Sequence, residues 1–277
     1  MEIIDEDCLA ETAEFTGTFE MPVAPLEVLR RNRLGGDTPP VRLPQGGDRT
    51  VAGVGVRVFA PDHVGGVYLH IHGGGWSFGS ADGQDERLWR LALEARLAVV
   101  SVEYRLAPEH PFPAGPDDCE AVARWLAEHA EAEFGTTRLL IGGESAGAHL
   151  SVLTLLRVPG VFRAANLVFG AYDLSAPKTA RLQRTYELFT PGMTAERRRD
   201  PAISPLFADL TGLPPARIVV GNEDPLLDDS VALAERWRAP VRLSVVAGAP
   251  HGFTLFPLTI AERERRRERE FLAGSGV

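Results

Sequence analysis

The chain has 277 residues and is acidic, with 29 lysines and arginines against 38 aspartates and glutamates and a formal net charge of −9 at pH 7. Its length suits one large α/β domain or a core that carries a small cap. The acidic balance argues against nucleic acid as the main partner. No apolar run is long enough to span a bilayer, which argues against a membrane protein.

Only two cysteines occur in the sequence, Cys8 and Cys119, and they are too few for a disulfide framework. Both are expected to be reduced and incidental. The first residues are acidic, which is unlike a secretory signal, and no cluster of Cys and His has metal-ligand spacing. The sequence therefore predicts a cytoplasmic protein without a metal or cofactor, and it leaves a homodimer open.

Strand and helix patterns alternate from residue 54 onward. Apolar strand patterns occupy residues 54–61, 67–72, 97–102, 139–141, 164–169, 216–220 and 241–246. Helix patterns occupy residues 85–96, 117–129, 226–238 and 260–272, and a further helix is expected after residue 145. This alternation predicts an α/β fold, in which a mostly parallel central sheet carries helices on both faces.

Other segments lack this regular pattern or carry unusual charge. A short amphipathic helix is expected near residues 24–34, before a break rich in glycine and proline. Residues 172–205 have no clear period and are rich in proline, which marks an insertion between core elements. The last helix pattern, at residues 260–272, alternates glutamate with arginine and is most simply interpreted as a solvated face.

The segment Gly143-Glu144-Ser145-Ala146-Gly147 has the pattern G-x-S-x-G, between an apolar strand and a helix start with small residues. This context predicts a strand, a tight turn and a helix, with Ser145 strained at the turn so that its Oγ points into a cleft. A Cβ at either glycine would collide with the neighbouring strand and helix. The motif alone is only suggestive, so the catalytic interpretation of Ser145 depends on partners elsewhere in the chain.

A serine nucleophile needs a base and an orienting acid, which in this fold type follow it in the order Asp or Glu, then His. Only two histidines follow Ser145 in the chain, His149 and His251. His149 lies one turn along the helix of the serine, where its ring is expected to pack against the sheet. His251 is the expected base, because it follows the last strand at the carboxyl end of a parallel sheet.

Four carboxylates compete for the role of acid within residues 222–229. Asp224 is the expected acid, because it lies where the strand at residues 216–220 runs out into its loop, and Pro225 then favours entry into a helix. Asp228 and Asp229 fall inside that helix. They are interpreted as charges of its first turn, facing solvent or the helix N-terminus.

A run of glycines supplies candidate donors for an oxyanion. The segment His72-Gly73-Gly74-Gly75-Trp76 follows a strand, and its three glycines leave backbone N–H groups unshielded by side chains. The amide of Ala146 would add a further donor at the start of the next helix. The alternative, a flexible turn without function, fits less well with the buried strand that precedes the glycines.

Together these motifs resemble those of the hormone-sensitive lipase-like group of α/β-hydrolases, the bacterial carboxylesterases with an HGGG motif. The matching segments are residues 72–76, 104–114, 143–147, 224–226 and 251–253. The resemblance implies that Ser145 is the nucleophile and that Asp224 and His251 are its acid and base partners. It also implies that the oxyanion donors are Gly74, Gly75 and Ala146. It also implies an α/β-hydrolase core at residues 41–171 and 206–277, with a small helical cap built from residues 1–40 and 172–205.

The chain departs from the pattern of the family at a few positions. Glu144 stands where the family usually has aspartate, and Ala148-His149 stand where it commonly has Gly-Asn. The usual glycine and tyrosine after Asp228-Asp229 are missing. These departures leave the substrate size and the cap geometry open, whereas the reaction type is unaffected.

The expected activity is the hydrolysis of short- to medium-chain carboxylic esters through an acyl-enzyme. Four residues are expected to form substrate-binding walls: Trp76, Phe189, Met193 and Phe207. An amidase, a carbamate hydrolase or an acyltransferase could use the same three catalytic residues, because the shape of the pocket selects the leaving group. A third interpretation is a non-catalytic ligand-binding protein, since the plant gibberellin receptors resemble this family but lack the catalytic histidine. The presence of His251 argues against it.

Overall fold

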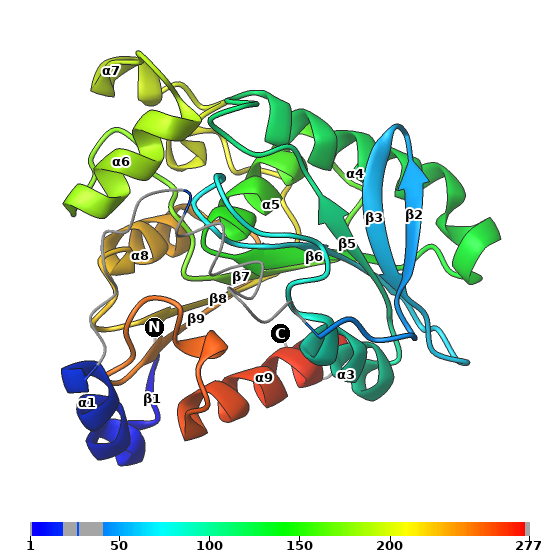
Figure 1. Ribbon diagram of the computed structural model, residues 1–277, viewed down its shortest axis with the longest axis horizontal. Coiled ribbons are helices and arrows are strands. Elements are labelled where there is room, and N and C mark those ends of the chain that lie inside the picture. The colour runs from blue at the N-terminus through cyan, green and yellow to red at the C-terminus, as the bar shows by residue number, and fades with distance from the viewer. Residues whose placement is uncertain (1, 19–26, 28–40, 275–277) are drawn as a thin grey trace.

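The computed structural model describes residues 2–18, 27 and 41–274. In this part of the chain, nine strands form one sheet in the order β1-β9-β8-β7-β6-β4-β5-β3-β2 (Figure 1). The strands are β1 (Glu2–Ile4), β2 (Gly47–Val51), β3 (Val54–Phe59), β4 (Val67–Ile71), β5 (Ala98–Glu103), β6 (Leu139–Glu144), β7 (Ala164–Val168), β8 (Ala216–Gly221) and β9 (Val241–Val246). The β2–β3 and β3–β5 pairs are antiparallel and the others parallel, so β4, β6, β8 and β9 end at the same edge.

Helices cover both faces of this sheet. On one face α3 (Asp85–Ala95) and α9 (Thr259–Leu272) pack together, and on the other lie α4 (Ala114–Phe134), α5 (Ala146–Arg157) and α8 (Leu227–Arg236) (Figure 1). The described residues also contain α1 (Leu9–Thr18), and α6 (Ala180–Phe189) and α7 (Ala195–Arg198) within the insertion. The predicted fold class, a mostly parallel sheet with helices on both faces, is confirmed.

The elements follow from simple features of the sequence. The strands β4 and β8 are buried at every position, which explains why their sequences are almost continuously apolar. The helix predicted for residues 117–129 runs further at both ends, from Ala114 to Phe134. It ends at Gly135, which adopts φ 72°, a left-handed conformation that glycine reaches without a Cβ clash.

The N-terminal residues form an edge strand that the sequence pattern did not indicate. β1 runs parallel to β9, with Glu2 opposite Ser244 and Ile4 opposite Val246. Residues 2–4 therefore belong to the sheet, and their assignment to a cap segment is wrong. The helix expected at residues 24–34 lies outside the described residues, apart from residue 27, and the rest of the division into core and cap stays a prediction.

The terminal helix α9 is not the solvated face that its alternating charges suggested. Glu264 and Glu268 are only 2% and 3% exposed. Arg217 of β8 donates two hydrogen bonds to Glu264 at 2.6 and 2.7 Å, and Arg87 of α3 donates two to Glu268 at 2.7 and 2.8 Å. The prediction was wrong because a guanidinium can hold a carboxylate in the interior, and both arginines come from distant segments of the chain.

Both cysteines are buried and free of disulfide bonds. Burial raises the pKa of the Cys119 thiol, which makes it a poor nucleophile and identifies it as a packing residue. Within the described residues, no helix combines the length and the apolar character needed to cross a membrane. The same residues contain no group of three or more His, Cys, Asp or Glu side chains able to hold a metal ion.

Candidate active site

Ser145 occupies the sharp turn between β6 and α5. Its backbone has φ 54° and ψ −116°, which is costly for a residue with a Cβ, and its N–H donates to the carbonyl oxygen of Val168 at 2.9 Å. A Cβ at Gly143 or at Gly147 would collide with the carbonyl oxygen of Ile71, at the end of β4. The two glycines of the G-x-S-x-G pattern therefore let β6 and α5 approach β4, as the motif predicts.

A serine, a histidine and an aspartate form one chain of hydrogen-bonding groups. Ser145 Oγ lies 3.0 Å from His251 Nε2, and His251 Nδ1 lies 2.8 Å from Asp224 Oδ2. The other carboxylate oxygen of Asp224 accepts the N–H of Leu226 at 2.8 Å, which fixes the orientation of the carboxylate. The structure thus brings together the three residues expected from the sequence, in the arrangement that general-base activation of a serine needs.

The environment of His251 suits a base that must reach solvent and substrate. Its side chain is 21% exposed, whereas the Asp224 side chain is fully buried. The ring of Phe169, just after β7, packs edge-on against the imidazole with 4.9 Å between ring centroids. The position of the imidazole is therefore fixed by its hydrogen bond to Asp224 and by the edge-on contact with the ring of Phe169.

The three other carboxylates near Asp224 are placed differently from one another. Glu223 and Asp228 are exposed, as expected of charges around a helix start. Asp229 is buried, and the expectation that it faces solvent or only the helix N-terminus is wrong. Its Oδ2 accepts the backbone N–H groups of Tyr172 and Asp173 at 2.6 and 2.9 Å, so it anchors the beginning of the insertion. Burial raises the pKa of this carboxyl to about 6.

The pH dependence of stability should reveal the buried carboxyl of Asp229. Its pKa of about 6 in the folded state exceeds the ordinary 3.8, so the native state holds the proton more tightly. This contribution to stability is complete below about pH 4 and is lost as the pH rises through 6. Relative to wild type, Asp229→Asn should therefore gain up to about 3 kcal/mol of unfolding free energy between pH 4 and pH 7. Urea denaturation at the two pH values measures the gain, and an equal difference at both would contradict the prediction.

The glycine loop after β4 lies directly against the turn that carries Ser145. A Cβ at Gly73 would collide with the carbonyl oxygen of Glu144 and would lie 3.5 Å from the Cβ of Ser145. Gly74 and Gly75 both have positive φ, at 122° and 55°. Within the described part of the chain, the amides of Gly74, Gly75 and Ala146 donate to no other group, so they are available to an oxyanion.

Glu144, between the glycine pair and Ser145, is a buried carboxylate that lies beside an arginine and a histidine. Arg87 donates a hydrogen bond to its Oε1, and His70 Nε2 lies 3.3 Å from its Oε2. Burial by itself would raise the pKa of Glu144, but the adjacent Arg87 and His70 hold it well below the ordinary range. Glu144, which stands where the family usually has aspartate, is therefore ionised and lies next to the turn at Ser145.

The four expected wall residues differ in their surroundings. Trp76 and Phe189 are 3% and 1% exposed, and their rings stack at 4.6 Å between centroids. Met193 and Phe207 are half-buried, and the guanidinium of Arg199 lies 4.8 Å from the ring of Phe207. The contact of these four residues with a substrate stays a prediction.

His149 is a polar link that sequence reasoning missed, because its ring was expected only to pack against the sheet. Its ring nitrogens lie 3.1 Å from the indole nitrogen of Trp76 and 2.7 Å from the carbonyl oxygen of Ile203. The ring therefore joins α5 to the glycine loop and to the insertion. The available signal was the departure from the family pattern at this position.

The family model of the alpha/beta hydrolase fold matches residues 68–255. The chain belongs to the α/β-hydrolase family. This hydrolase is 36% identical over 257 residues to carboxylesterase NlhH of Mycobacterium tuberculosis. The matched region covers 80% of each chain. It is 32% identical over 235 residues to the ethyl acetate hydrolase of Pseudomonas putida, across 76% of this chain and 74% of that protein. A solved hormone-sensitive lipase from a metagenome library superposes with a TM-score of 0.82 at 28% identity, across 99% of both chains.

These similarities confirm that the hydrolase is a carboxylesterase of the hormone-sensitive lipase-like group, as its motifs indicated. The roles of the individual site residues rest on the geometry described above and are proposals.

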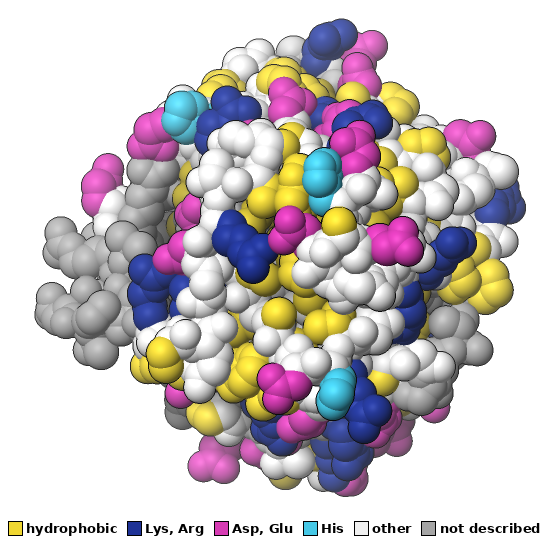
Figure 2. Space-filling view, turned by 90° about the vertical axis from the view of Figure 1, so that its right-hand side faces the viewer, with side chains coloured by type: hydrophobic (Ala, Val, Ile, Leu, Met, Phe, Trp, Pro, Cys, Tyr) yellow, Lys and Arg dark blue, Asp and Glu magenta, His cyan; other side chains and the backbone are white. Residues whose placement is uncertain are grey.

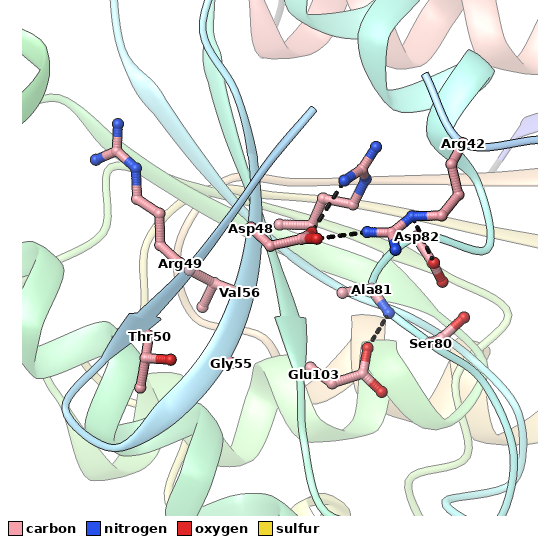
Figure 3. Close-up of a pocket in the computed structure, with 11 residues that line it drawn as sticks. Arg42, Asp48, Arg49, Thr50, Gly55, Val56, Ser80, Ala81, Asp82 and Glu103 are labelled. Atoms are coloured by element: carbon pink, nitrogen blue, oxygen red, sulfur yellow. Dashed lines mark hydrogen bonds and ion pairs between the residues drawn. The ribbon is translucent and has the colours of Figure 1, made fainter. Parts of the chain in front are cut away.

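A hollow of about 590 Å³ opens beside β2 and β3, and none of the three residues of the serine site lines it (Figure 3). Its three arginines are paired with carboxylates, and Glu103 accepts the backbone N–H of Ala81 at 2.6 Å. Arg57 donates to Asp48 at 2.9 Å, and the Arg42 guanidinium lies 3.2 Å from the Asp82 carboxylate. Figure 2 shows a similar mixture of both signs over one face of the molecule. Each of the three arginines that line the hollow therefore already has a counter-charge.

Proposed function

We propose that this carboxylesterase cleaves its substrates through an acyl-enzyme on Ser145. The supporting observation is the unbroken chain from Ser145 Oγ to His251 and Asp224, with separations of 3.0 and 2.8 Å. As Ser145 Oγ attacks the carbonyl carbon, its proton passes to His251 Nε2. Asp224, hydrogen-bonded to Nδ1, holds the imidazole in the required tautomer and stabilises the imidazolium that forms.

The negative oxygen of the tetrahedral intermediate is proposed to accept hydrogen bonds from the amides of Gly74, Gly75 and Ala146. These donors are fixed before the reaction, so they stabilise the developing charge without reorganisation. When the intermediate collapses, the C–O bond to the alcohol breaks, and His251 returns its proton to the leaving alkoxide. Water then attacks the acyl group by the same steps in reverse order, which releases the acid and regenerates Ser145.

The substrates are proposed to be esters with short to medium acyl chains. The insertion at residues 172–205 is short, and its helix α6 brings Phe189 onto Trp76 beside the glycine loop. We infer that these two rings, together with Met193 and Phe207, form the walls of an acyl site of limited depth. A cap formed by residues 172–205 and part of 1–40 is proposed to cover this site. A cytoplasmic location and a homodimer also stay proposals.

A panel of p-nitrophenyl esters from acetate to palmitate tests this proposal. We expect kcat/KM to be highest between acetate and octanoate, because longer chains would exceed the walled site. Butyrate p-nitroanilide is the matched control with the same acyl group, and we expect it to react far more slowly than the ester. Efficient hydrolysis of emulsified long-chain triglyceride with little activity on butyrate esters would contradict the proposed substrate class.

A further inference from the structure

His149 is a fully buried histidine on the helix that begins at the proposed nucleophile, and both of its ring nitrogens are hydrogen-bonded. The indole Nε1 of Trp76 donates to Nδ1 at 3.1 Å, and Nε2 donates to the carbonyl oxygen of Ile203 at 2.7 Å. The backbone N–H of His149 donates to the carbonyl oxygen of Ser145 at 3.1 Å. The imidazole is therefore fixed relative to Ser145 by one turn of helix.

The two partners of the ring determine its protonation state. An indole nitrogen can only donate and a carbonyl oxygen can only accept, so the imidazole must be neutral with its proton on Nε2. A protonated ring would direct Nδ1–H at the indole N–H, donor against donor. Burial lowers the pKa of His149 to about 4, so the ring stays neutral at neutral pH.

Trp76 connects this histidine to the glycine loop. It follows Gly75 directly and has φ 55°, a conformation that a residue with a Cβ keeps only where its surroundings enforce it. Its ring is held by the hydrogen bond to His149, by the stacking on Phe189 at an interplanar angle of 15°, and by the edge-on ring of Tyr186 at 5.8 Å between centroids. The side chain of Trp76 therefore acts as the anchor of the peptide units at Gly74 and Gly75.

We propose that His149 is a positioning residue that holds Trp76, and through Trp76 the oxyanion donors of Gly74 and Gly75, in place relative to Ser145. The proposal rests on the proposed function of Ser145. His149 touches no reacting atom, and its effect reaches the reaction through the backbone of the glycine loop. Its second hydrogen bond, to Ile203, ties the insertion to the same helix.

Two substitutions of His149 separate its two hydrogen bonds. In His149→Asn, the Oδ1 atom can take the place of Nδ1 and accept from Trp76, but the side chain is too short to reach Ile203. In His149→Gln, the Nε2 atom can take the place of the imidazole Nε2 and donate to Ile203, but no acceptor faces the indole. Trp76→Phe removes the indole N–H and preserves an aromatic ring for stacking on Phe189.

The proposal predicts different activities for these variants. His149→Gln and Trp76→Phe should each lower kcat on p-nitrophenyl butyrate by about 10- to 100-fold, with little change in KM, because displaced donors weaken only the transition state. A boronic acid inhibitor, whose tetrahedral adduct places an oxygen among the same amides, should bind less tightly by a similar factor. His149→Asn should retain kcat within about threefold of wild type, because it keeps the acceptor.

Two controls accompany the activity measurements. His129→Gln is the matched control, because His129 is exposed and forms a stacked pair with Trp125 on α4. It should leave kcat and the affinity of the boronic acid unchanged. In the double variant that combines Trp76→Phe with His149→Gln, the loss should be no greater than in either single variant, because both remove the same hydrogen bond.

A second readout does not depend on activity. The Trp76 indole N–H, assigned in the ¹⁵N spectrum by its absence from Trp76→Phe, should be protected from hydrogen exchange in the wild type. The protection should persist in Ser145→Ala and His149→Asn and be lost in His149→Gln. This measurement keeps the two proposals apart, since an active Ser145→Ala enzyme would remove the proposed function and leave the indole result standing.

Several results would overturn the positioning role. Wild-type kcat in both His149→Gln and Trp76→Phe would do so, even with a protected indole. An exchanging Trp76 indole in the wild-type protein would remove its structural basis. An equal loss of kcat in His149→Asn and His149→Gln would assign the effect to the bond with Ile203 and would also reject the proposal.

Discussion

Ser145→Ala should lower kcat by about 10⁴-fold or more, which is the effect of removing a nucleophile that acts as one unit with its base and acid. The loss should be specific to the chemistry, because Ser145 Oγ contributes one hydrogen bond, to His251, and alanine fits the same turn. Steady-state kinetics on p-nitrophenyl butyrate measure the change. Thermal denaturation should show a folded protein of similar stability.

Covalent labelling provides an independent test of the same residue. An organophosphonate ester should inactivate the wild-type enzyme with one equivalent bound, and mass spectrometry should locate the label on Ser145. Ser151 is the matched control, because it lies on the same helix, is buried, and donates its hydroxyl to the carbonyl oxygen of Gly147 at 2.7 Å. Its substitution by alanine should leave labelling intact. A label on another residue, or full activity in Ser145→Ala, would show that the nucleophile is misassigned.

Asp224→Asn should lower kcat by about 10⁴-fold, because an amide in place of the carboxylate favours the wrong imidazole tautomer and no longer stabilises the imidazolium. The carboxylate contacts His251 Nδ1 through Oδ2 and the Leu226 N–H through Oδ1. Asparagine can keep only one of these contacts as an acceptor. The fold should persist, and kcat measured with the same ester at saturating concentration gives the effect.

The neighbouring carboxylates supply the controls for this assignment. Glu223→Gln and Asp228→Asn alter exposed groups and should leave kcat close to that of wild type. Asp229→Asn changes a buried group that anchors the insertion, so we expect it to alter stability and leave most of the activity. Near-normal activity in Asp224→Asn, combined with a collapse in Glu223→Gln, would place the acid elsewhere in this loop.

The serine site was predictable from the sequence because its geometry is encoded locally. A strand that ends in glycine, a serine and a second glycine require one kind of turn, since a Cβ at Gly143 or Gly147 would strike the same carbonyl of Ile71. The parallel sheet then brings the ends of β4, β6, β8 and β9 to one edge, which explains why Asp224 and His251 meet Ser145 although they are far away in the sequence.

The features that sequence reasoning missed depend on partners from distant segments. Glu264 and Glu268 look like surface charges until Arg217 and Arg87 are placed opposite them. Asp229 resembles a helix-start charge, but the insertion passes over it and removes it from water. The strand β1 is only three residues long, too short for a periodic pattern to distinguish it from a loop.

The paired charges of α9 have a consequence for the alignment of this helix on the sheet. Glu264 and Glu268 are four residues apart, close to one helical turn of about 5.4 Å, and each pairs with a different arginine. If α9 slid by one turn so that Arg87 faced Glu264, Arg217 would stay buried without a carboxylate partner, at a cost of about 3–5 kcal/mol. A slide in the other direction would leave Arg87 with Glu144 as its only carboxylate partner. Apolar contacts tolerate such sliding far better. The two ion pairs therefore fix the position of the C-terminal helix along the sheet.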